Sequence, residues 1–493
     1  MEVVLHYTGR IFIGFSFLFA IPAVTSLIAG EFAVSIDFLL SFGVMLGMGT
    51  ALAALCGNTR RPGWIHGMVT AGISWILTMV VAALPYWLSG HYLSYLDAMF
   101  DVMSGLTTTG LSLIQDLDHV SVGINMWRHL LSFVGGQGII VLALALFSDS
   151  AGGGYGLYVG EAKDERLFPS VMHTAKAIWR ISLIYLIVGT AALWLAGIMI
   201  GLTPARAFLH GVWIYLATWS TGGFAPMSQS ILYYHSALYE SITFIFFTLG
   251  SFNFALHASV LKGNRLELKK NIETVSFSIT LSLLVTLAAW GLIKLNVYPN
   301  LAALVRKGFY QLASAHTTTG FMTIYPRQFA EEWGYLPILA IIVAMMIGGS
   351  ASSTAGGFKG LRVGILLKAL AQDTKRLLRP NSAIVIQKFS YHGTRILLDQ
   401  QVRGAALIVL MYMAVFTMAA IAGCLAGFPF LDSVFEAASV TGNVGLSIGV
   451  TSSTIPAGLK LVYMFTMWVG RLEFMAALAS LGFLGTLFSR RPH

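Results

Sequence analysis

Four short turns rich in Gly, Thr and Ser are the segments of this 493-residue chain with the clearest ligand chemistry. They align on a glycine followed by a bulky apolar residue and read 107-TTTGL-111, 220-STGGF-224, 317-TTTGF-321 and 442-GNVGL-446. None contains a carboxylate or a thiolate, so their ligands would be backbone carbonyl and hydroxyl oxygens. Neutral oxygens replace the hydration shell of a large monovalent cation, whereas Mg²⁺ and transition metals favour carboxylate, His or Cys ligands. The turns therefore predict a site for a monovalent cation.

The four turns also share an upstream pattern. An aromatic residue stands ten positions before each anchor glycine and a small residue six positions before it. The aromatic residues are Phe100, Trp213, Tyr310 and Phe435, and the small residues are Ser104, Ala217, Ser314 and Ser439. A single such turn could be a packing motif of small residues between membrane helices, but aromatic residues make up only 12% of the chain. Four matches in register favour an internal repeat.

The composition is that of a membrane protein. Apolar residues make up 56% of the chain and charged residues 10%, against about 25% charged in soluble domains. This excludes an ordinary cytosolic enzyme and a nucleic-acid-binding protein. Cys56 and Cys424 are too few for a disulfide scaffold. Spans of about 20 apolar residues are predicted at 11–30, 34–56, 67–89, 124–147, 177–201, 238–261, 274–296, 336–357, 403–427 and 459–488.

Each turn follows an apolar segment that is too short to cross a bilayer, at 94–106, 205–219, 303–316 and 431–441. Irregular backbone at membrane depth must be buried in protein or line a water-filled cavity. The predicted fold is therefore an all-α polytopic membrane protein with four helix–pore-loop–helix repeats around a pseudo-fourfold pore. The expected units are an N-terminal helix pair at 1–66 and repeats at 67–160, 161–270, 271–395 and 396–493. Most of the 30 Lys and Arg residues then lie on one side if both termini are cytoplasmic.

Two features inside the predicted spans could control a pore. The segment 348-GGSASSTAGG-357 is a poor helix former, and it is either a close-packed helix or a loop that switches conformation. Lys359 follows as a cytoplasmic anchor or part of a barrier. Arg471 lies in the last span, where a charge is costly; it could neutralise a carboxylate, for which Glu473 and the pore-helix residues Asp101 and Glu436 are candidates. Asp97, Asp101, Asp116 and Asp118 are expected to give the outer mouth a negative bias, although Asp116 and Asp118 are better interpreted as part of a solvated loop.

These motifs resemble the superfamily of TrkH, KtrB and plant HKT potassium transporters. The resemblance rests on TTTGL and TTTGF after short helices, on 347-IGGSASSTAGGFKG-360 and on 468-WVGRLEF-474, and it covers about residues 67–488. The extra N-terminal helix pair is similar to the TrkH branch. The resemblance implies a potassium filter formed by Thr108, Thr109, Gly110, Thr221, Gly222, Gly223, Thr318, Thr319, Gly320, Asn443, Val444 and Gly445. Members of that superfamily with Ser in place of the first filter glycine tend to favour Na⁺, so the resemblance implies that Gly110 supports K⁺. In the fourth turn the register leaves Asn443 and Val444 as alternative filter-lining residues.

The resemblance also implies a gate and partners. The gate is an intramembrane loop at 348–357 with Gly348, Gly349, Gly356 and Gly357, followed by Lys359, and Arg471 is a barrier to cations below the filter. The implied assembly is a homodimer on a cytosolic ring of TrkA-like nucleotide-binding subunits. The basic loop from Lys359 to Arg403 could contact that ring or anionic lipid. Because the chain has no Walker A or Rossmann motif, nucleotide control would have to come from such a partner.

The expected function is potassium uptake through a channel-like pore in the bacterial cytoplasmic (inner) membrane, with K⁺ as the transported ligand and no organic cofactor. The alternative is a Na⁺- or H⁺-coupled potassium symporter, although intramembrane Asp, Glu and His residues are scarce for a proton relay. An intramembrane enzyme is disfavoured because His129, His210 and His257 are isolated from any nucleophile in the sequence.

Overall fold

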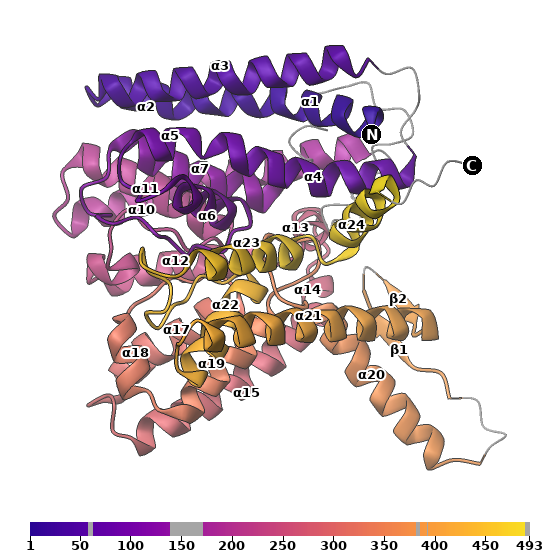
Figure 1. Ribbon diagram of the computed structural model, residues 1–493. Coiled ribbons are helices and arrows are strands. Elements are labelled where there is room, and N and C mark those ends of the chain that lie inside the picture. The colour runs from indigo at the N-terminus through magenta and orange to yellow at the C-terminus, as the bar shows by residue number, and fades with distance from the viewer. Residues whose placement is uncertain (58–62, 139–170, 381–384, 392, 489–493) are drawn as a thin grey trace, which may run out of the picture.

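The computed structural model describes residues 1–57, 63–138, 171–380, 385–391 and 393–488 (Figure 1). These residues are mostly α-helical. The end of the predicted span 124–147, the expected boundary between residues 160 and 161, and the basic residues Arg60, Arg61, Lys163, Arg166, Arg490 and Arg491 lie outside the described residues.

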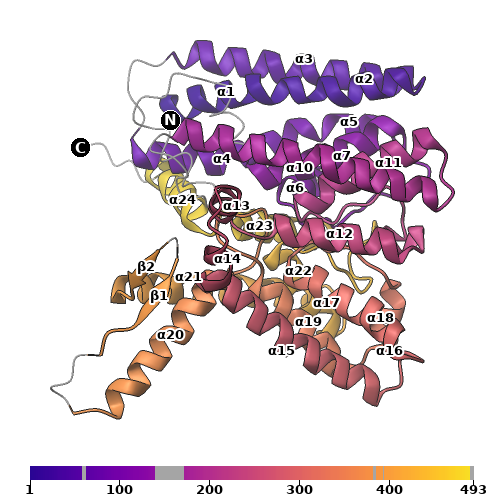
Figure 2. The same cartoon turned by 180° about the vertical axis from the view of Figure 1, so that it is seen from behind.

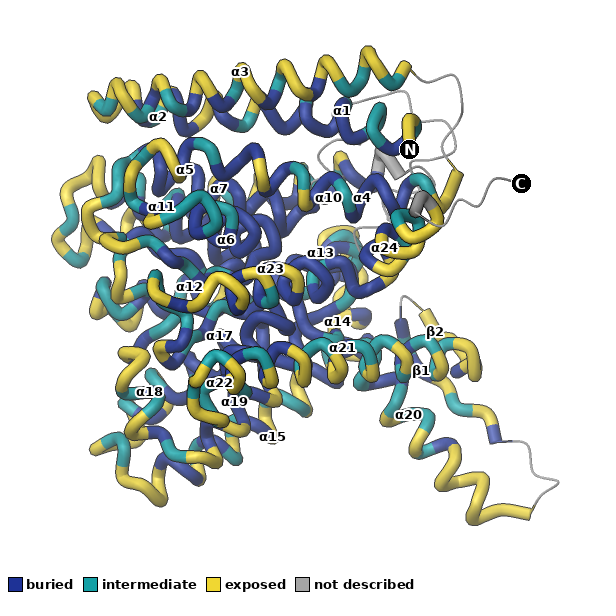
Figure 3. The backbone as a smooth tube through the Cα atoms, viewed as in Figure 1, coloured by how far each residue is buried: buried dark blue, intermediate teal, exposed yellow. Residues whose placement is uncertain are grey.

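An N-terminal helix pair lies along one side of the molecule, at the top of Figure 1. It consists of α1 (Glu2–Ser16), a 3₁₀ turn (Phe17–Phe19) and α2 (Ala20–Ile28), followed by α3 (Phe32–Leu55). The helices approach closely at Gly9, which has no side chain. A Cβ atom there would lie only 2.7 Å from the carbonyl oxygen of Gly49. The connection is tied to the rest of the protein by Glu31, whose carboxylate accepts a 2.8 Å hydrogen bond from the N–H of Val122. Figure 3 shows that the outer face of α3 is exposed, as expected for an apolar helix in contact with lipid.

Six helices of the described residues are long and apolar enough to cross a membrane. They are Glu2–Ile28, Phe32–Leu55, Trp64–Leu88, Thr174–Met199, Ile272–Lys294 and Asp399–Leu425. Within them the structure distinguishes α4 (Trp64–Ala82), α5 (Leu84–Leu88), α10 (Val171–Met199), α15 (Ile272–Lys294) and α21 (Asp399–Leu425). All six coincide with spans predicted from the sequence.

Two spans predicted as single helices are broken. Helices α12 (Ala237–Gly250) and α13 (Phe254–Leu261) meet at 100°, and α23 (Ala457–Arg471) and α24 (Met475–Phe488) meet at 116°. The first break occurs where the Asn253 side chain accepts from the Ala255 N–H and starts a new helix. The second occurs at Glu473 and Phe474, whose φ angles of 49° and 71° are incompatible with a right-handed helix. Prediction by hydropathy missed both breaks because the segments stay apolar across them.

The two remaining predicted spans are shorter as helices. Helix α7 (Val122–Gln137) is followed by Gly138 at a φ of 100°, and the rest of that span is outside the described residues. Helix α19 (Tyr335–Ile347) ends at Gly348, whose φ is 73°. Residues 348–359 are not helical, so this segment is a loop and not a close-packed helix, while its change of conformation stays a prediction.

The four short segments are short helices in the interior. They are α6 (Tyr95–Leu106), α11 (Pro204–Trp219), the joined elements α16 (Leu301–Ala303), η3 (Leu304–Phe309) and α17 (Tyr310–His316), and α22 (Phe430–Gly442). The C-terminal ends of all four are buried, whereas the starts of α11 and α16 are exposed; the buried centre of the molecule is dark blue in Figure 3. Each is followed by one of the Gly-containing turns.

One part of the chain projects from this body. Helix α20 (Gly360–Leu377) points away from the other helices in both views, and β1 (Lys388–Ser390) and β2 (Thr394–Ile396) form an antiparallel hairpin near its base (Figure 2). Ile272, Ile365, Phe389 and Leu397 pack together between them. The remaining short elements are a 3₁₀ helix (Ser230–Tyr234), α14 (Leu266–Lys270) and α18 (Pro326–Glu332).

Candidate functional site

The four Gly-containing turns have the same backbone conformation. The anchor glycines have left-handed φ angles, which are 88° at Gly110, 67° at Gly223, 80° at Gly320 and 89° at Gly445. The residues two positions earlier are also left-handed, with φ angles of 56° at Thr108, 50° at Thr221, 54° at Thr318 and 54° at Asn443. A β-branched residue such as Thr rarely adopts this conformation. Its occurrence at equivalent places in three turns indicates that the surrounding structure imposes it.

Hydrogen bonds from the turns to the short helices fix the register of all four. The residue before each anchor glycine donates its N–H to the carbonyl oxygen of the small residue near the end of the preceding helix. The bonds run from Thr109 to Ser104 (2.8 Å), from Gly222 to Ala217 (2.8 Å), from Thr319 to Ser314 (2.8 Å) and from Val444 to Ser439 (2.9 Å). Asn443 is therefore the counterpart of Thr108, and Val444 is the counterpart of Thr109. The backbone thus answers the question of register in the fourth turn.

The four anchor glycines form a closed ring. A Cβ atom on any of them would overlap a carbonyl oxygen of the next turn along the chain. The overlapping pairs are Gly110 with Gly222, Gly223 with Thr319, Gly320 with Val444, and Gly445 with Thr109. The last pair returns to the first turn, so the turns surround one axis. Carbonyl oxygens from all four turns therefore lie next to the glycines of their neighbours, and a side chain at any of these positions would disrupt the ring.

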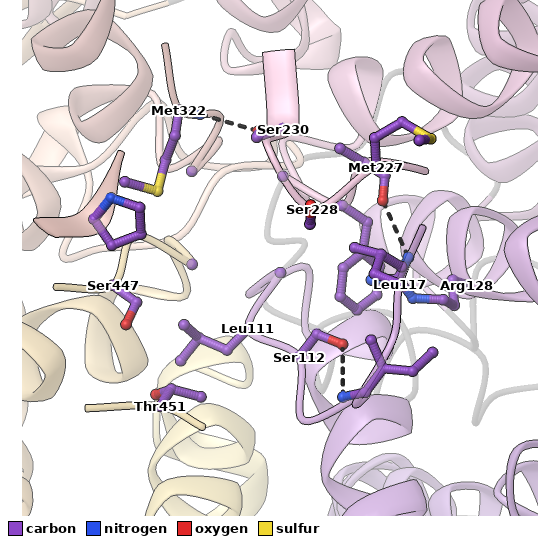
Figure 4. Close-up of a pocket in the computed structure, with 18 of the residues that line it drawn as sticks. Leu111, Ser112, Leu117, Arg128, Met227, Ser228, Ser230, Met322, Ser447 and Thr451 are labelled. Atoms are coloured by element: carbon purple, nitrogen blue, oxygen red, sulfur yellow. Dashed lines mark hydrogen bonds between the residues drawn. The ribbon is translucent and has the colours of Figure 1, made fainter. Parts of the chain in front are cut away.

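A cavity of about 310 Å³ lies against one end of this ring. All four anchor glycines line it, together with residues that follow them, such as Ser112, Met322, Ser447 and Thr451 (Figure 4). No Asp or Glu is among its described lining residues. Three acidic residues that we expected at the mouth have other partners: Asp97 pairs with Lys460 at 2.5 Å, Asp116 with His119 at 2.8 Å, and Asp118 accepts from the N–H of Ser228 at 2.8 Å.

The loop 348–359 lies against the opposite end of the ring. The N–H of Gly356 donates to the hydroxyl of Thr318 at 2.7 Å, and the hydroxyls of Thr354 and Thr221 are 3.2 Å apart. A Cβ atom on Gly356 would overlap the carbonyl oxygen of Gly442. Two residues of the loop therefore contact three of the turns. Thr354 was not among the residues singled out from the sequence, because one hydroxyl among many in this segment gave no signal.

Arg471 holds this loop through backbone carbonyl groups. Its guanidinium donates to the carbonyl oxygens of Thr354 (2.6 Å), Gly135 (2.9 Å) and Gly136 (3.0 Å). Arg471 is the last residue of α23, while Gly135 and Gly136 belong to α7. The charge therefore joins three parts of the chain that are far apart in sequence.

The carboxylates considered as partners of Arg471 have other contacts. Glu473 forms ion pairs with Lys359, at 3.8 Å, and with Arg362. All three side chains are at most 12% exposed. The glycines at the two ends of the loop also meet, because a Cβ on Gly348 would overlap the carbonyl oxygen of Gly356. Gly349 is close to Ser251, and Gly357 is close to Gly348. Lys359 donates to the carbonyl oxygen of Ala355 and so belongs to the same closed loop.

The proteins similar to this chain are described as cation or potassium transport proteins. The family described as TrkH, cation transport protein, matches residues 37–481. The Trk system potassium uptake protein TrkH of Escherichia coli (strain K12) is 30% identical over 488 residues, covering 96% of each chain. An uncharacterised cation transporter of Methanocaldococcus jannaschii is 29% identical over 487 residues, which covers 97% of this chain and 94% of the relative. The crystal structure of the potassium transporter TrkH from Vibrio parahaemolyticus superposes with a TM-score of 0.83 at 26% identity and covers 99% of both chains. The chain therefore belongs to the TrkH family of cation transport proteins.

Proposed function

We propose that this protein conducts K⁺ through the ring of four turns, which acts as a selectivity filter. The observation that carries the proposal is the closed contact ring of Gly110, Gly223, Gly320 and Gly445 with the carbonyl oxygens of neighbouring turns. Rings of neutral carbonyl oxygens can take the place of the hydration shell of K⁺. The relatives named as potassium uptake and transport proteins support the choice of ion.

The proposed filter residues are those at the three positions ending at each anchor glycine. They are Thr108, Thr109, Gly110, Thr221, Gly222, Gly223, Thr318, Thr319, Gly320, Asn443, Val444 and Gly445. The hydroxyl of Thr108 is buried without a hydrogen-bond partner among the described residues. Thr318 and Thr221, at equivalent positions, bond to the loop 348–359. The Thr108 hydroxyl is therefore a candidate ligand for an ion or for its last water molecule.

The loop 348–357 is the proposed gate, and Arg471 and Lys359 are proposed barrier residues. The loop is supported in this role by its contacts with Thr318 and Thr221 at the inner end of the filter. In this position it would prevent a hydrated ion from leaving the filter. Arg471 and Lys359 add two positive charges next to it, which would repel a cation in a medium of low dielectric constant.

The proposal also covers the membrane topology of the protein and its assembly with partners. The protein would cross the bacterial cytoplasmic membrane with both termini in the cytoplasm, as the Lys and Arg distribution favours, in a unit at 1–66 and repeats at 67–160, 161–270, 271–395 and 396–493. We propose a homodimer on a TrkA-like cytosolic ring, docked on the projecting helix α20 and its basic side chains Lys375 and Arg376.

The test is ion flux through the purified protein in liposomes, with the reversal potential measured between K⁺ and Na⁺ solutions. Gly110→Ser and Gly320→Ser should reduce the preference for K⁺, because the new side chains overlap carbonyl oxygens of the ring. Gly404→Ser is the matched control, since Gly404 lies on α21 with no atom within 4 Å of its Cβ position. Absence of flux in the wild type, or unchanged selectivity in both filter variants, would refute the filter. A reversal potential that follows an imposed Na⁺ or H⁺ gradient would instead indicate coupled symport.

A further inference from the structure

Three of the four filter turns are braced by the same position of the preceding short helix. This position is nine residues before the anchor glycine and holds Asp101, Gln311 and Glu436. Asp101 accepts from the N–H of Leu113 at 2.7 Å and from the hydroxyl of Ser112 at 2.5 Å.

The other two braces, Gln311 and Glu436, likewise bond to residues that follow the anchor glycine of their own turn. Gln311 accepts from the N–H of Thr323 at 3.3 Å and donates to the carbonyl oxygen of Phe321, also at 3.3 Å. Glu436 accepts from the hydroxyl of Ser447 and from that of Thr451, the latter at 3.0 Å. Each brace is buried, and each holds the residues that leave the filter toward the outer cavity.

The second turn lacks both partners of this brace: the polar side chain on the short helix and the N–H donor after the anchor glycine. Its short helix has Ile214 at the bracing position, which offers no polar atom. The residue three positions after Gly223 is Pro226, where the first and third turns have Leu113 and Thr323. Proline has no N–H to donate, so a polar side chain at position 214 could not accept a hydrogen bond from that residue. The two differences are consistent with each other and leave the residues after Gly223 without a side-chain hydrogen bond from the bracing position of their own short helix.

Arg128 of α7 contacts the second turn at the same place. Its guanidinium donates to the carbonyl oxygen of Ala225 at 3.1 Å and lies 4.5 Å from the centre of the Phe224 ring. These are the two residues that follow Gly223. Asn125 accepts a further bond from the same nitrogen at 3.4 Å. Arg128 is only 1% exposed and lines the outer cavity, where Figure 4 shows it on the same side as Leu117 and Met227.

We infer that Arg128 is the positioning residue of the second filter turn and replaces the brace that the other three turns receive from their own short helices. The inference rests on the proposed role of the turns as a filter. A positive charge at the mouth of a cation pathway would be unfavourable for conduction, so its presence needs a compensating role. Its stacking on Phe224 and its attraction to Asp101 reduce that cost, and its hydrogen bond fixes the Ala225 carbonyl group.

The test compares Arg128→Met with Arg206→Met in liposomes. Arg206 is an exposed arginine near the start of α11 that bonds to Tyr233, so its loss removes an equal charge without touching a filter turn. We expect the permeability ratio of K⁺ to Na⁺ to fall about three- to ten-fold in Arg128→Met, the range for the net loss of one ordinary hydrogen bond, and to stay at the wild-type value in Arg206→Met. A folded Arg128→Met protein with wild-type selectivity, or equal losses in both variants, would overturn the inference.

A rescue variant tests the brace directly. Ile214→Gln with Pro226→Thr introduces the pair found in the third turn, Gln311 and Thr323. Added to Arg128→Met, these changes should restore selectivity toward the wild-type ratio. If Arg128→Met alone does not fold, the triple variant is measured instead: a folded, K⁺-selective triple variant supports the inference, and failure to fold overturns it. A wild-type protein with no preference for K⁺ would refute the filter itself, and the inference with it.

Discussion

The guanidinium of Arg471 and the carbonyl oxygen of Thr354 are joined by a 2.6 Å hydrogen bond. The hydroxyl of the same Thr354 lies 3.2 Å from that of Thr221, which belongs to the second Gly-containing turn. One residue of the proposed gate therefore separates the buried charge from the ring of turns. A displacement of the gate must break the bond to Arg471, so the barrier and the gate are expected to act together.

Arg471→Ala should increase K⁺ flux in the absence of any partner. The substitution removes a positive charge beside the pathway and also removes three hydrogen bonds to carbonyl oxygens, one of them on the gate. The measurement is tracer uptake into liposomes together with single-channel conductance. A folded variant with unchanged conductance and flux would contradict the barrier role.

Arg471→Lys separates the two effects. Lysine keeps the charge, but its single ammonium group cannot reproduce the geometry of a guanidinium shared among three carbonyl groups. Higher flux in the Ala variant alone would indicate electrostatic control. Higher flux in both variants would indicate that Arg471 acts mainly by holding the loop.

Thr354→Val should favour the open gate. The hydroxyl of Thr354 lies 3.0 Å from the carbonyl oxygen of Trp219 and 2.8 Å from that of Gly250, which share its single proton. Valine has nearly the same shape without a donor. A net loss of about 1 kcal/mol per hydrogen bond predicts roughly a five- to thirty-fold rise in the ratio of open to closed protein, seen as open probability. Thr417→Val, at an exposed position of α21, is the control.

Deletion within 350–356 should raise basal uptake in the same direction, and unchanged uptake would remove the support for a gate.

The four Gly-containing turns could be located from the sequence because their spacing and composition are local signals, while their role as a filter stays a proposal. The alignment on Gly110, Gly223 and Gly320 needed no structure. The fourth turn was ambiguous because Asn443 and Val444 differ from the Thr residues elsewhere. Only the left-handed φ of Asn443 and the bond from Val444 to Ser439 fixed its register.

Contacts between distant segments were not predictable in the same way. The sequence placed Arg471 in a span and left open whether it neutralises a carboxylate or forms a barrier, but it gave no sign of the hydrogen bonds to the carbonyl oxygens of Thr354 and Gly135. Carbonyl groups are present at every residue, so no sequence pattern marks the ones that a helix break exposes. The bends in α12–α13 and α23–α24 were missed for the related reason that hydropathy does not report backbone direction.

Glu473→Gln should lower the thermal stability of the protein. Glu473 pairs with Lys359 and Arg362, and all three side chains are nearly buried. Removing one member of such a group leaves uncompensated buried charge, which costs about 3–5 kcal/mol. The measurement is the melting temperature in detergent. Glu331→Gln is the control, because Glu331 pairs with Arg327 at the surface and should contribute less than about 1 kcal/mol. Equal melting temperatures for the two variants would contradict the structural role of Glu473.

Asn443 is expected to couple the fourth filter turn to the first. Its amide nitrogen donates to the hydroxyl of Thr109 at 3.1 Å and to the carbonyl oxygen of Met467 at 2.9 Å. Asn443→Thr introduces the residue found at the equivalent place in the other turns, and Thr109→Val removes the acceptor. Each single variant should lower both the melting temperature and the preference for K⁺, because each removes the bond between the two turns.

The double variant tests whether the two residues act through one bond. If they do, its loss of stability should be smaller than the sum of the single losses by about 0.5–3 kcal/mol, the range for directly interacting side chains. The pair Thr317 and Thr319, whose hydroxyls are 2.8 Å apart within one turn, provides a comparison that involves no second turn. Additive effects of Asn443→Thr and Thr109→Val would show that the ring is held by its backbone contacts alone. Coupled effects on selectivity as well as on stability would show that this bond helps to set the geometry at which the ring binds K⁺.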